Sequence, residues 1–331
     1  MEAEADRAVL RELWTRSRMK DQVSAVANKN DWLTVSAVTA LAMCLTSFDH
    51  EALGHGAACL LVHGHIRLLS SSLFRCDVKS GWIDPAGPAG NLLMGTLALL
   101  CLRFVPVQFL IARLFLILVT AFSYFWESGY VIRAMYRRDG DLYFFAEFLV
   151  GRVSIWQRWL AAGAGLALYI FAVRIVSDAL LTLWPHARPA RRVARIAWVS
   201  GTAAAAIGAL AYAGPGWADF RDAILEIGGA SFPLLFIPLW DRRIEPTQRS
   251  AFIERSPRLI AVSLVVYAGF VASLGRGIAP PRCRREADAG PVGALARLPS
   301  IASHCSRDAQ RICLRTVTDC WNRFESCLCV C

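Results

Sequence analysis

The stretch from His50 to His55 reads His-Glu-Ala-Leu-Gly-His and follows the apolar run 32–48. Imidazole nitrogens are common zinc ligands, and a carboxylate beside them can take a proton from a water molecule. Polar groups within an apolar span are costly, so they suggest function. The stretch therefore predicts a zinc site in which His50 and His55 are ligands and Glu51 is the general base.

The spacing of the two histidines constrains the backbone between them. In a regular α-helix, residues four apart lie about 40° from each other around the axis, whereas residues five apart lie about 140° from each other. A π-bulge absorbs one additional residue, and Gly54 gives the backbone local freedom. We expect such a bulge between His50 and His55. The alternative interpretation is a solvated helix end at the membrane surface that carries these side chains without a metal.

Two further motifs follow in the chain. Gly-Pro-Ala-Gly-Asn at 87–91 opens the next apolar segment, and Asp-Gly-Asp at 139–141 precedes the apolar run 142–150. With the histidine stretch, they resemble in order the motifs of the site-2 protease family of intramembrane zinc metallopeptidases. The six-residue histidine motif is also similar to that of the dipeptidyl-peptidase III family. The resemblance covers about residues 32–150. It departs from the family pattern in the additional residue between the histidines and in having no room for a PDZ domain, which implies a compact member.

Three aspartates compete to be the third zinc ligand. Asp84 precedes the Gly-Pro-x-x-Asn match, which is too early for the family order. Asp139 is the literal counterpart of the family's aspartate next to glycine, but it follows Arg137 and Arg138, which favour a solvated ion pair. Asp141 opens an apolar run, so it can begin a helix and face inward. We expect Asp141 to be the ligand, with Asp139 as the alternate.

The resemblance implies a zinc-dependent endopeptidase that hydrolyses peptide bonds of membrane-embedded substrates. Glu51 would be catalytic, and the resemblance alone suggests that Asn91 helps to position the substrate. The alternative is a non-catalytic polytopic protein that keeps the same core; the intact Glu51 favours the enzyme. Membrane di-iron hydroxylases need more clustered histidines than the six present in this chain.

The composition is typical of a polytopic membrane protein. The 331 residues are 56% hydrophobic and include 11 tryptophans, and the apolar runs are long rather than alternating, which favours helices. The net charge of +10 indicates basic loops that face the cytoplasm and anionic headgroups rather than nucleic acid. The expected partners are therefore the lipid bilayer and a membrane-protein or peptide substrate. A bacterial inner membrane is the expected location.

We predict an all-α fold with about seven transmembrane helices. Their expected ranges are 32–62, 86–102, 104–126, 159–184, 196–213, 223–240 and 259–274. Residues 66–85 mix apolar residues with serines and charged residues. This pattern predicts a short re-entrant or β-like excursion, and its edge could bind an unwound peptide by strand addition. The polar stretch 127–129 predicts an interruption of the helix after the third segment.

Four regions follow from these patterns: a cytoplasmic basic arm at 1–31, a metallopeptidase-like core at 32–150, additional transmembrane helices at 151–279, and an Arg/Cys-rich disordered tail at 280–331. Lys and Arg are more numerous in the loops on the N-terminal side, which favours a cytoplasmic N-terminus. Seven of the 11 cysteines fall in the tail. A disulfide framework is therefore not expected in the body.

Overall fold

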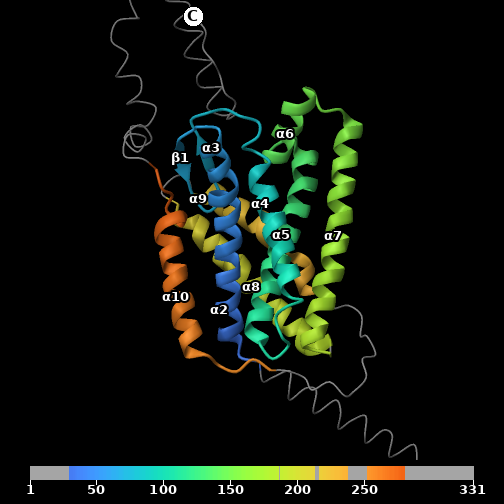
Figure 1. Cartoon of the computed structure of the whole chain (residues 1–331), viewed down its shortest axis with the longest axis vertical. Coiled ribbons are helices and arrows are strands. Elements are labelled where there is room, and N and C mark those ends of the chain that lie inside the picture. Colours follow the sequence, from blue (N-terminus) through green and yellow to red (C-terminus); the bar gives the residue numbers. More distant parts are fainter. Residues whose placement is uncertain (1–29, 186, 213–215, 238–251, 280–331) are drawn as a thin grey trace, which may run out of the picture. The chain divides into compact units, whose positions relative to one another are not determined.

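A computed structural model describes residues 30–185, 187–212, 216–237 and 252–279, which are predominantly helical (Figure 1). Most of the expected basic arm and the whole expected tail lie outside these residues. Five helices are long and apolar enough to cross a membrane: Trp32–Leu61, Leu110–Arg137, Ile155–Leu183, Ala187–Leu210 and Pro257–Gly275. A shorter apolar helix spans Ala86–Cys101. The chain is therefore a helical protein with the features of a multi-pass membrane protein.

The first span consists of three consecutive helical elements. These are α2 (Trp32–Phe48), a π-helix η1 (Asp49–Gly56) and α3 (Ala57–Leu61). Asp31 caps α2 by accepting a hydrogen bond of 2.8 Å from the backbone N–H of Thr34, which satisfies one of the free donors at the helix start. The chain thus runs as one helix from Trp32 to Leu61 and changes its hydrogen-bond register at the histidines.

A short antiparallel hairpin follows the first span. It pairs β1 (Ile66–Leu69) with β2 (Phe74–Cys76), and Leu69 also forms a bridge with Ile278 after the last helix. A disulfide between Cys59 and Cys76 joins α3 to β2. The expectation of a body without disulfides is therefore wrong: although most cysteines lie in the tail, the turn after α3 brings these two together.

The helix that contains the polar stretch 127–129 is not interrupted. After α4 (Ala86–Cys101), α5 (Leu110–Arg137) continues through the polar stretch 127–129, so the expected break there is wrong. Glu127 forms its hydrogen bonds sideways with side chains of neighbouring helices, and the backbone ladder of α5 stays intact. Polar residues in this segment therefore reflect neighbours inside the bundle rather than a break in the helix.

The second half of the chain packs around α2 and α5: α6, α7 and η2 lie against α5, whereas α8 and α10 lie against α2. It comprises α6 (Asp141–Val150), α7 (Ile155–Leu183), α8 (Ala187–Leu210), α9 (Gly216–Ala223), η2 (Ile224–Gly229), η3 (Phe232–Leu235), α10 (Pro257–Phe270) and η4 (Val271–Gly275). Phe122 and Phe125 of α5 are almost fully buried in the core, whereas α7 and α10 expose large apolar side chains such as Ile170 and Val265. Exposed apolar surface of this kind suits a lipid environment.

The segment predicted over 223–240 was expected to be broken at the glycine pair 228–229 and at Pro233, and its described part is broken there. There the chain forms the end of α9, a π-turn and a short 3-10 helix. The glycine pair at 228–229 and Pro233 weaken a continuous helix. These short elements place the polar residues of α9 and η2 beside α5.

Two independent features distinguish the ends of the bundle. The hairpin with its disulfide and α6 lie at one end, whereas the α4–α5 connection and the starts of α2 and α10 lie at the other (Figure 1). The first three turns of α8, which follow the end of α7, carry Arg188, Arg191, Arg192 and Arg195. Disulfides persist in oxidising compartments, and Arg-rich ends favour the cytoplasm.

We predict that the hairpin end faces the oxidising side of the membrane and that the α4–α5 connection faces the cytoplasm. Lys79→Cys and Val107→Cys, each made in a chain whose non-disulfide cysteines are replaced by serine, test this orientation. A membrane-impermeant maleimide should label position 79 in intact cells and position 107 only after permeabilisation. The reverse pattern would contradict the orientation.

Candidate metal centre

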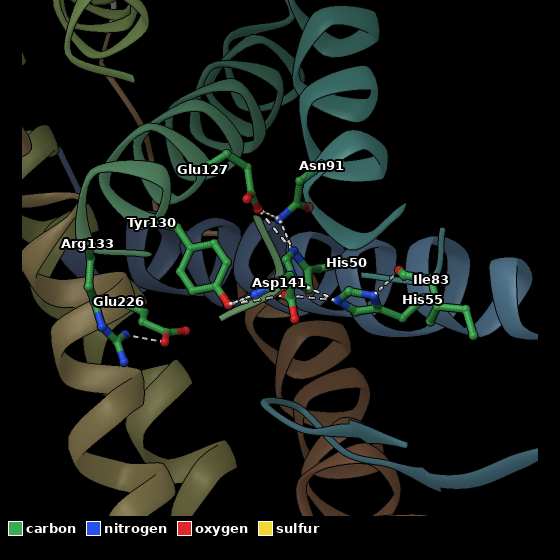
Figure 2. A network of polar contacts seen from close by, with 9 residues as sticks. All are labelled: His50, His55, Ile83, Asn91, Glu127, Tyr130, Arg133, Asp141 and Glu226. Atoms are coloured by element: carbon green, nitrogen blue, oxygen red, sulfur yellow. Dashed lines mark hydrogen bonds and ion pairs between the residues drawn. The ribbon is translucent and has the colours of Figure 1, made fainter. Parts of the chain in front are cut away.

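Three donor atoms from distant parts of the sequence converge at the end of the first span. His50 Nε2 and His55 Nε2 lie 3.3 Å apart, and Asp141 Oδ2 lies 3.3 Å from His55 Nε2 and 3.8 Å from His50 Nε2 (Figure 2). Ligand atoms of a tetrahedral zinc with bonds of 2.0–2.1 Å lie about 3.3 Å apart. The three residues form a group that could hold a metal ion. The distances between their donor atoms are close to those around a tetrahedral zinc ion.

The π-helix makes the five-residue spacing of the histidines usable. The expected bulge is confirmed as η1, which covers Asp49–Gly56 and contains both histidines. Its wider turn pairs residue i with residue i+5, so it brings His50 and His55 to one face, where an α-helix would separate them. Both side chains are buried, each about 4% exposed. The additional residue relative to the family motif is therefore accommodated locally.

The second nitrogen of each imidazole is held by an acceptor. His55 Nδ1 lies 2.8 Å from the backbone oxygen of Ile83, and His50 Nδ1 lies 3.0 Å from Glu127 Oε1. A carbonyl oxygen and a carboxylate accept hydrogen bonds, so they favour the tautomers in which both Nδ1 atoms carry the proton. The amide nitrogen of Asn91 also lies 3.1 Å from His50 Nδ1, but its shorter contact, of 2.7 Å, is with Glu127 Oε1. Both Nε2 lone pairs then point at each other and at Asp141. Such an arrangement is repulsive unless the groups share a cation or a proton.

Asp141 reaches the histidines because the chain turns sharply before α6. Gly140 has φ of +92°, and a Cβ on it would lie 2.6 Å from the hydroxyl oxygen of Tyr130. That hydroxyl donates to Asp141 Oδ2 at 3.2 Å and accepts from the Asp141 backbone N–H at 3.0 Å. Glycine at 140 and Tyr130 together fix the start of α6 and the direction of the Asp141 carboxylate.

The competing aspartates are placed differently. Asp139 is exposed, and its carboxylate accepts a hydrogen bond from the backbone N–H of Gly140; it does not belong to the group around the two histidines. Asp84 lines the cavity beside them. Burial raises the pKa of Asp84 to about 6, the charge of Asp141 adds to this shift, and His55 opposes it. Of the three aspartates, Asp141 is therefore the one that meets both imidazoles.

Burial alone would raise the pKa of the Asp141 carboxyl. The imidazoles of His55 and His50, when protonated, outweigh burial and hold this pKa below its usual range. A metal cation shared by the three side chains acts in the same direction. The carboxylate is therefore ionised in the form that a metal needs.

Close backbone packing of α4 against η1 leaves room for the donors. A Cβ on Gly87 would lie 2.3 Å from His55 Nε2 and 2.8 Å from His50 Nε2, so any side chain there would occupy the centre itself. A Cβ on Gly54 would lie 2.6 Å from the Cα of Gly87. The two glycines therefore let the helices approach until the backbone of α4 borders the metal position.

Glu51 lies between the histidines on η1 and lines the same cavity as His55 and Asp141. The side chain is about 4% exposed, and its Oε2 has no hydrogen-bond partner among the described residues. A buried carboxylate without partners is costly, by roughly 1–3 kcal/mol or more. A water molecule beside the metal position would provide the missing partner.

Asn91 and Glu127 lie behind His50 rather than in the cavity. Asn91 is fully buried, and its amide donates to Glu127 Oε1 at 2.7 Å, the same oxygen that faces His50 Nδ1 (Figure 2). Trp126 stacks on the His50 ring with centroids 4.6 Å apart. Sequence reasoning did not assign Glu127 to the site. Its signal was a carboxylate within an apolar segment, which was interpreted as a helix break.

Comparisons with protein-family models, with curated proteins and with solved structures find no significant match. The functional interpretation depends on the geometry of the described residues.

We predict that the detergent-purified protein binds about one zinc per chain. His50→Ala, His55→Ala and Asp141→Asn should each lose it, because two remaining protein donors hold zinc poorly. Metal analysis of the folded variants measures this, with Asp139→Asn as the matched control that should keep its zinc. Loss of zinc in Asp139→Asn but not in Asp141→Asn would show that Asp139, and not Asp141, is the third ligand.

Glu127→Gln should lower the affinity for zinc by about 10–100-fold, because the neutral amide holds the Nδ1–H of His50 less strongly and can present a donor in its place. Competition with a chelator of known affinity measures the change, and Glu147→Gln on the exposed side of α6 is the matched control. An unchanged zinc affinity in Glu127→Gln would show that this carboxylate does not orient His50.

Proposed function

We propose that the protein is a zinc-dependent intramembrane endopeptidase that hydrolyses peptide bonds of membrane-embedded substrates. The observation that carries the proposal is the convergence of His50, His55 and Asp141 at zinc-like separations, with both imidazole Nδ1 atoms tied to acceptors. The position of Glu51 in the same cavity supports hydrolysis rather than a purely structural metal, because structural zinc sites are usually closed by four protein ligands.

His50, His55 and Asp141 would hold the metal. When bound, zinc polarises the carbonyl of the scissile bond and makes a nearby water molecule more acidic. Glu51 takes a proton from this water as the water oxygen adds to the carbonyl carbon. It then gives the proton to the nitrogen as the C–N bond breaks, which leaves a carboxylic acid and an amine.

Asn91 supports this chemistry from behind the site. Because it is fully buried and donates to Glu127, we place its role in orienting His50 rather than in contacting the substrate. The orientation of the His50 imidazole then depends on a chain of hydrogen bonds from Asn91 through Glu127 to its Nδ1 atom.

The hairpin is the element best placed to present a substrate. Ser72, Leu73 and Phe74 line the cavity that contains Glu51, and the Phe74 ring stacks on His55 with centroids 5.5 Å apart. An extended peptide added along β2 would pass this wall of the cavity. We propose that the hairpin is the re-entrant element of a protein with about seven spans in a bacterial inner membrane.

Glu51→Gln should keep the zinc but abolish cleavage, since the amide cannot accept the proton from water. The expected loss of turnover is at least about 100-fold, the contribution typical of a general base. The assay is cleavage of single-span peptides in liposomes, with new termini identified by mass spectrometry and Glu147→Gln as the matched control. If Glu51→Gln cut the same bonds at the same rate, another group would have to be the base.

A further inference from the structure

The cavity beside the metal centre extends toward α9 and η2 and is strongly acidic. It has a volume of about 280 Å³. In addition to Glu51 and Asp141 it is lined by five carboxylates, Asp84, Asp139, Asp219, Asp222 and Glu226. The basic side chains in its lining are those of Arg133 and Arg137. The cavity wall therefore carries five carboxylates beyond Glu51 and Asp141, the two that the proposed metal chemistry uses.

Arg133 does not neutralise this wall. Its guanidinium pairs with Glu226, and its NH2 group lies 3.8 Å from Asp222 Oδ1. In Figure 2 the side chain of Arg133 points toward Glu226, while Tyr130 stands between it and Asp141. Burial raises the pKa of Glu226 to about 7, and the charge of Arg133 opposes this shift. Arg133 is thus shared between two acids, and the NH2 group of Arg221 also lies 3.5 Å from Asp222 Oδ1, at the exposed edge of α9. Asp84, Asp139 and Asp219, which also line the cavity, still outnumber the remaining lining arginine, Arg137.

Asp219 provides a second, independent observation. Its side chain lines the cavity from α9 and is only 7% exposed, and its Oδ2 has no hydrogen-bond partner among the described residues. Burial and the charge of Asp222 raise the pKa of Asp219, which Arg75 opposes. A buried carboxylate without a partner is costly unless a cation or donor occupies the adjacent space.

The shape of the acidic region argues against a second metal ion. Within the part of the chain that the structure describes, the His50, His55 and Asp141 group is the one set of three ligand atoms close enough to share an ion. The carboxylates of α9 and η2 are more widely spaced. Spaced acceptors suit a long basic side chain, because a guanidinium donates five hydrogen bonds in a fixed plane and an ammonium donates three.

We propose that this acidic part of the cavity binds the side chain of an arginine or lysine that lies close to the scissile bond of the substrate. The proposal rests on the proposed endopeptidase function and adds a substrate class to it. Asp219 and Asp222 are the recognition residues. A peptide lying along β2 places its reacting carbonyl near Glu51 while one basic side chain reaches α9 through the same cavity.

The first experiment measures binding and does not depend on turnover. The zinc-loaded Glu51→Gln protein is titrated with Leu/Ala-based single-span peptides in which one arginine occupies successive positions of the polar flank and the adjoining membrane turn. Citrulline replaces arginine in the control peptides because it has the same shape without the charge. At one position, or two adjacent positions, the arginine peptide should bind at least about tenfold more tightly than its citrulline partner.

Variants then locate the preference. In the same Glu51→Gln background, Asp219→Asn and Asp222→Asn should each reduce the arginine-to-citrulline ratio toward one, while zinc content and affinity for the citrulline peptide stay unchanged. Glu147→Gln, which removes one exposed carboxylate of α6 outside the cavity, is the matched control and should keep the full ratio. If Asp219→Asn does not fold, Asp222→Asn provides the test, because a substitution at this partly exposed position disturbs the packing less.

The outcomes separate this inference from the proposed function. A ratio near one at every position, or a ratio that survives both variants, would overturn the basic-side-chain site even if the protein cleaves peptides. Arginine-selective binding that disappears in Asp219→Asn or Asp222→Asn would support the site even if no peptide is cleaved, in which case the endopeptidase proposal alone fails.

Discussion

Two imidazole lone pairs and a carboxylate oxygen face one another inside a buried pocket, and much of the surrounding structure serves this contact. The two Nε2 atoms are 3.3 Å apart, which neutral imidazoles with protonated Nδ1 atoms do not favour by themselves. The two nitrogen lone pairs and the carboxylate oxygen repel one another at low dielectric unless they share a cation or a proton. The fold must therefore hold these groups together, and a metal ion bound between them would turn their repulsion into binding energy.

Three backbone features hold the groups in place. The π-helix brings two histidines five residues apart to one face, Gly87 lets α4 approach the donor atoms, and Gly140 turns the chain so that α6 begins with Asp141. Each feature carries a local cost, because π-turns are rare and glycines lose much conformational freedom on folding. Local rules are typically broken where a site requires it, and here all three exceptions border the same centre.

The sequence allowed the three residues that converge to be predicted as candidate ligands, but not the arrangement that supports them. His50 and His55 stood out as polar residues in an apolar run, and their spacing alone required a π-turn. Glu127 carried the same kind of signal, but a carboxylate in a span can reflect either a break or a buried partner, and only the packing of α4 against α5 distinguishes the two. The Cys59–Cys76 disulfide and the short elements after α8 likewise depend on contacts between distant segments, which composition does not encode. All five long spans were expected as helices. The ends of α5, α7 and α8 differ from the expected ranges because apolarity does not mark where caps and connections lie.

The depth of the centre along the first span bears on how water and substrate could meet. With a rise of 1.5 Å per residue, His50 lies roughly 27 Å from Trp32 along the helix axis, close to the far side of a hydrocarbon core about 30 Å thick. The hairpin and α6 cover this end of the bundle, and the cavity that reaches the donors is lined by polar and charged groups. Water could therefore reach the donor atoms from the membrane face at the hairpin end, without crossing the apolar layer. In the proposed endopeptidase, a helical substrate segment would have its backbone carbonyls occupied by intrahelical hydrogen bonds, so it would have to unwind before one of them could approach Glu51. Such unwinding is least costly near a membrane surface, where water and the edge of a strand can take over the released hydrogen bonds. The position of the histidines, in the part of the first span that is remote from Trp32, fits such a depth.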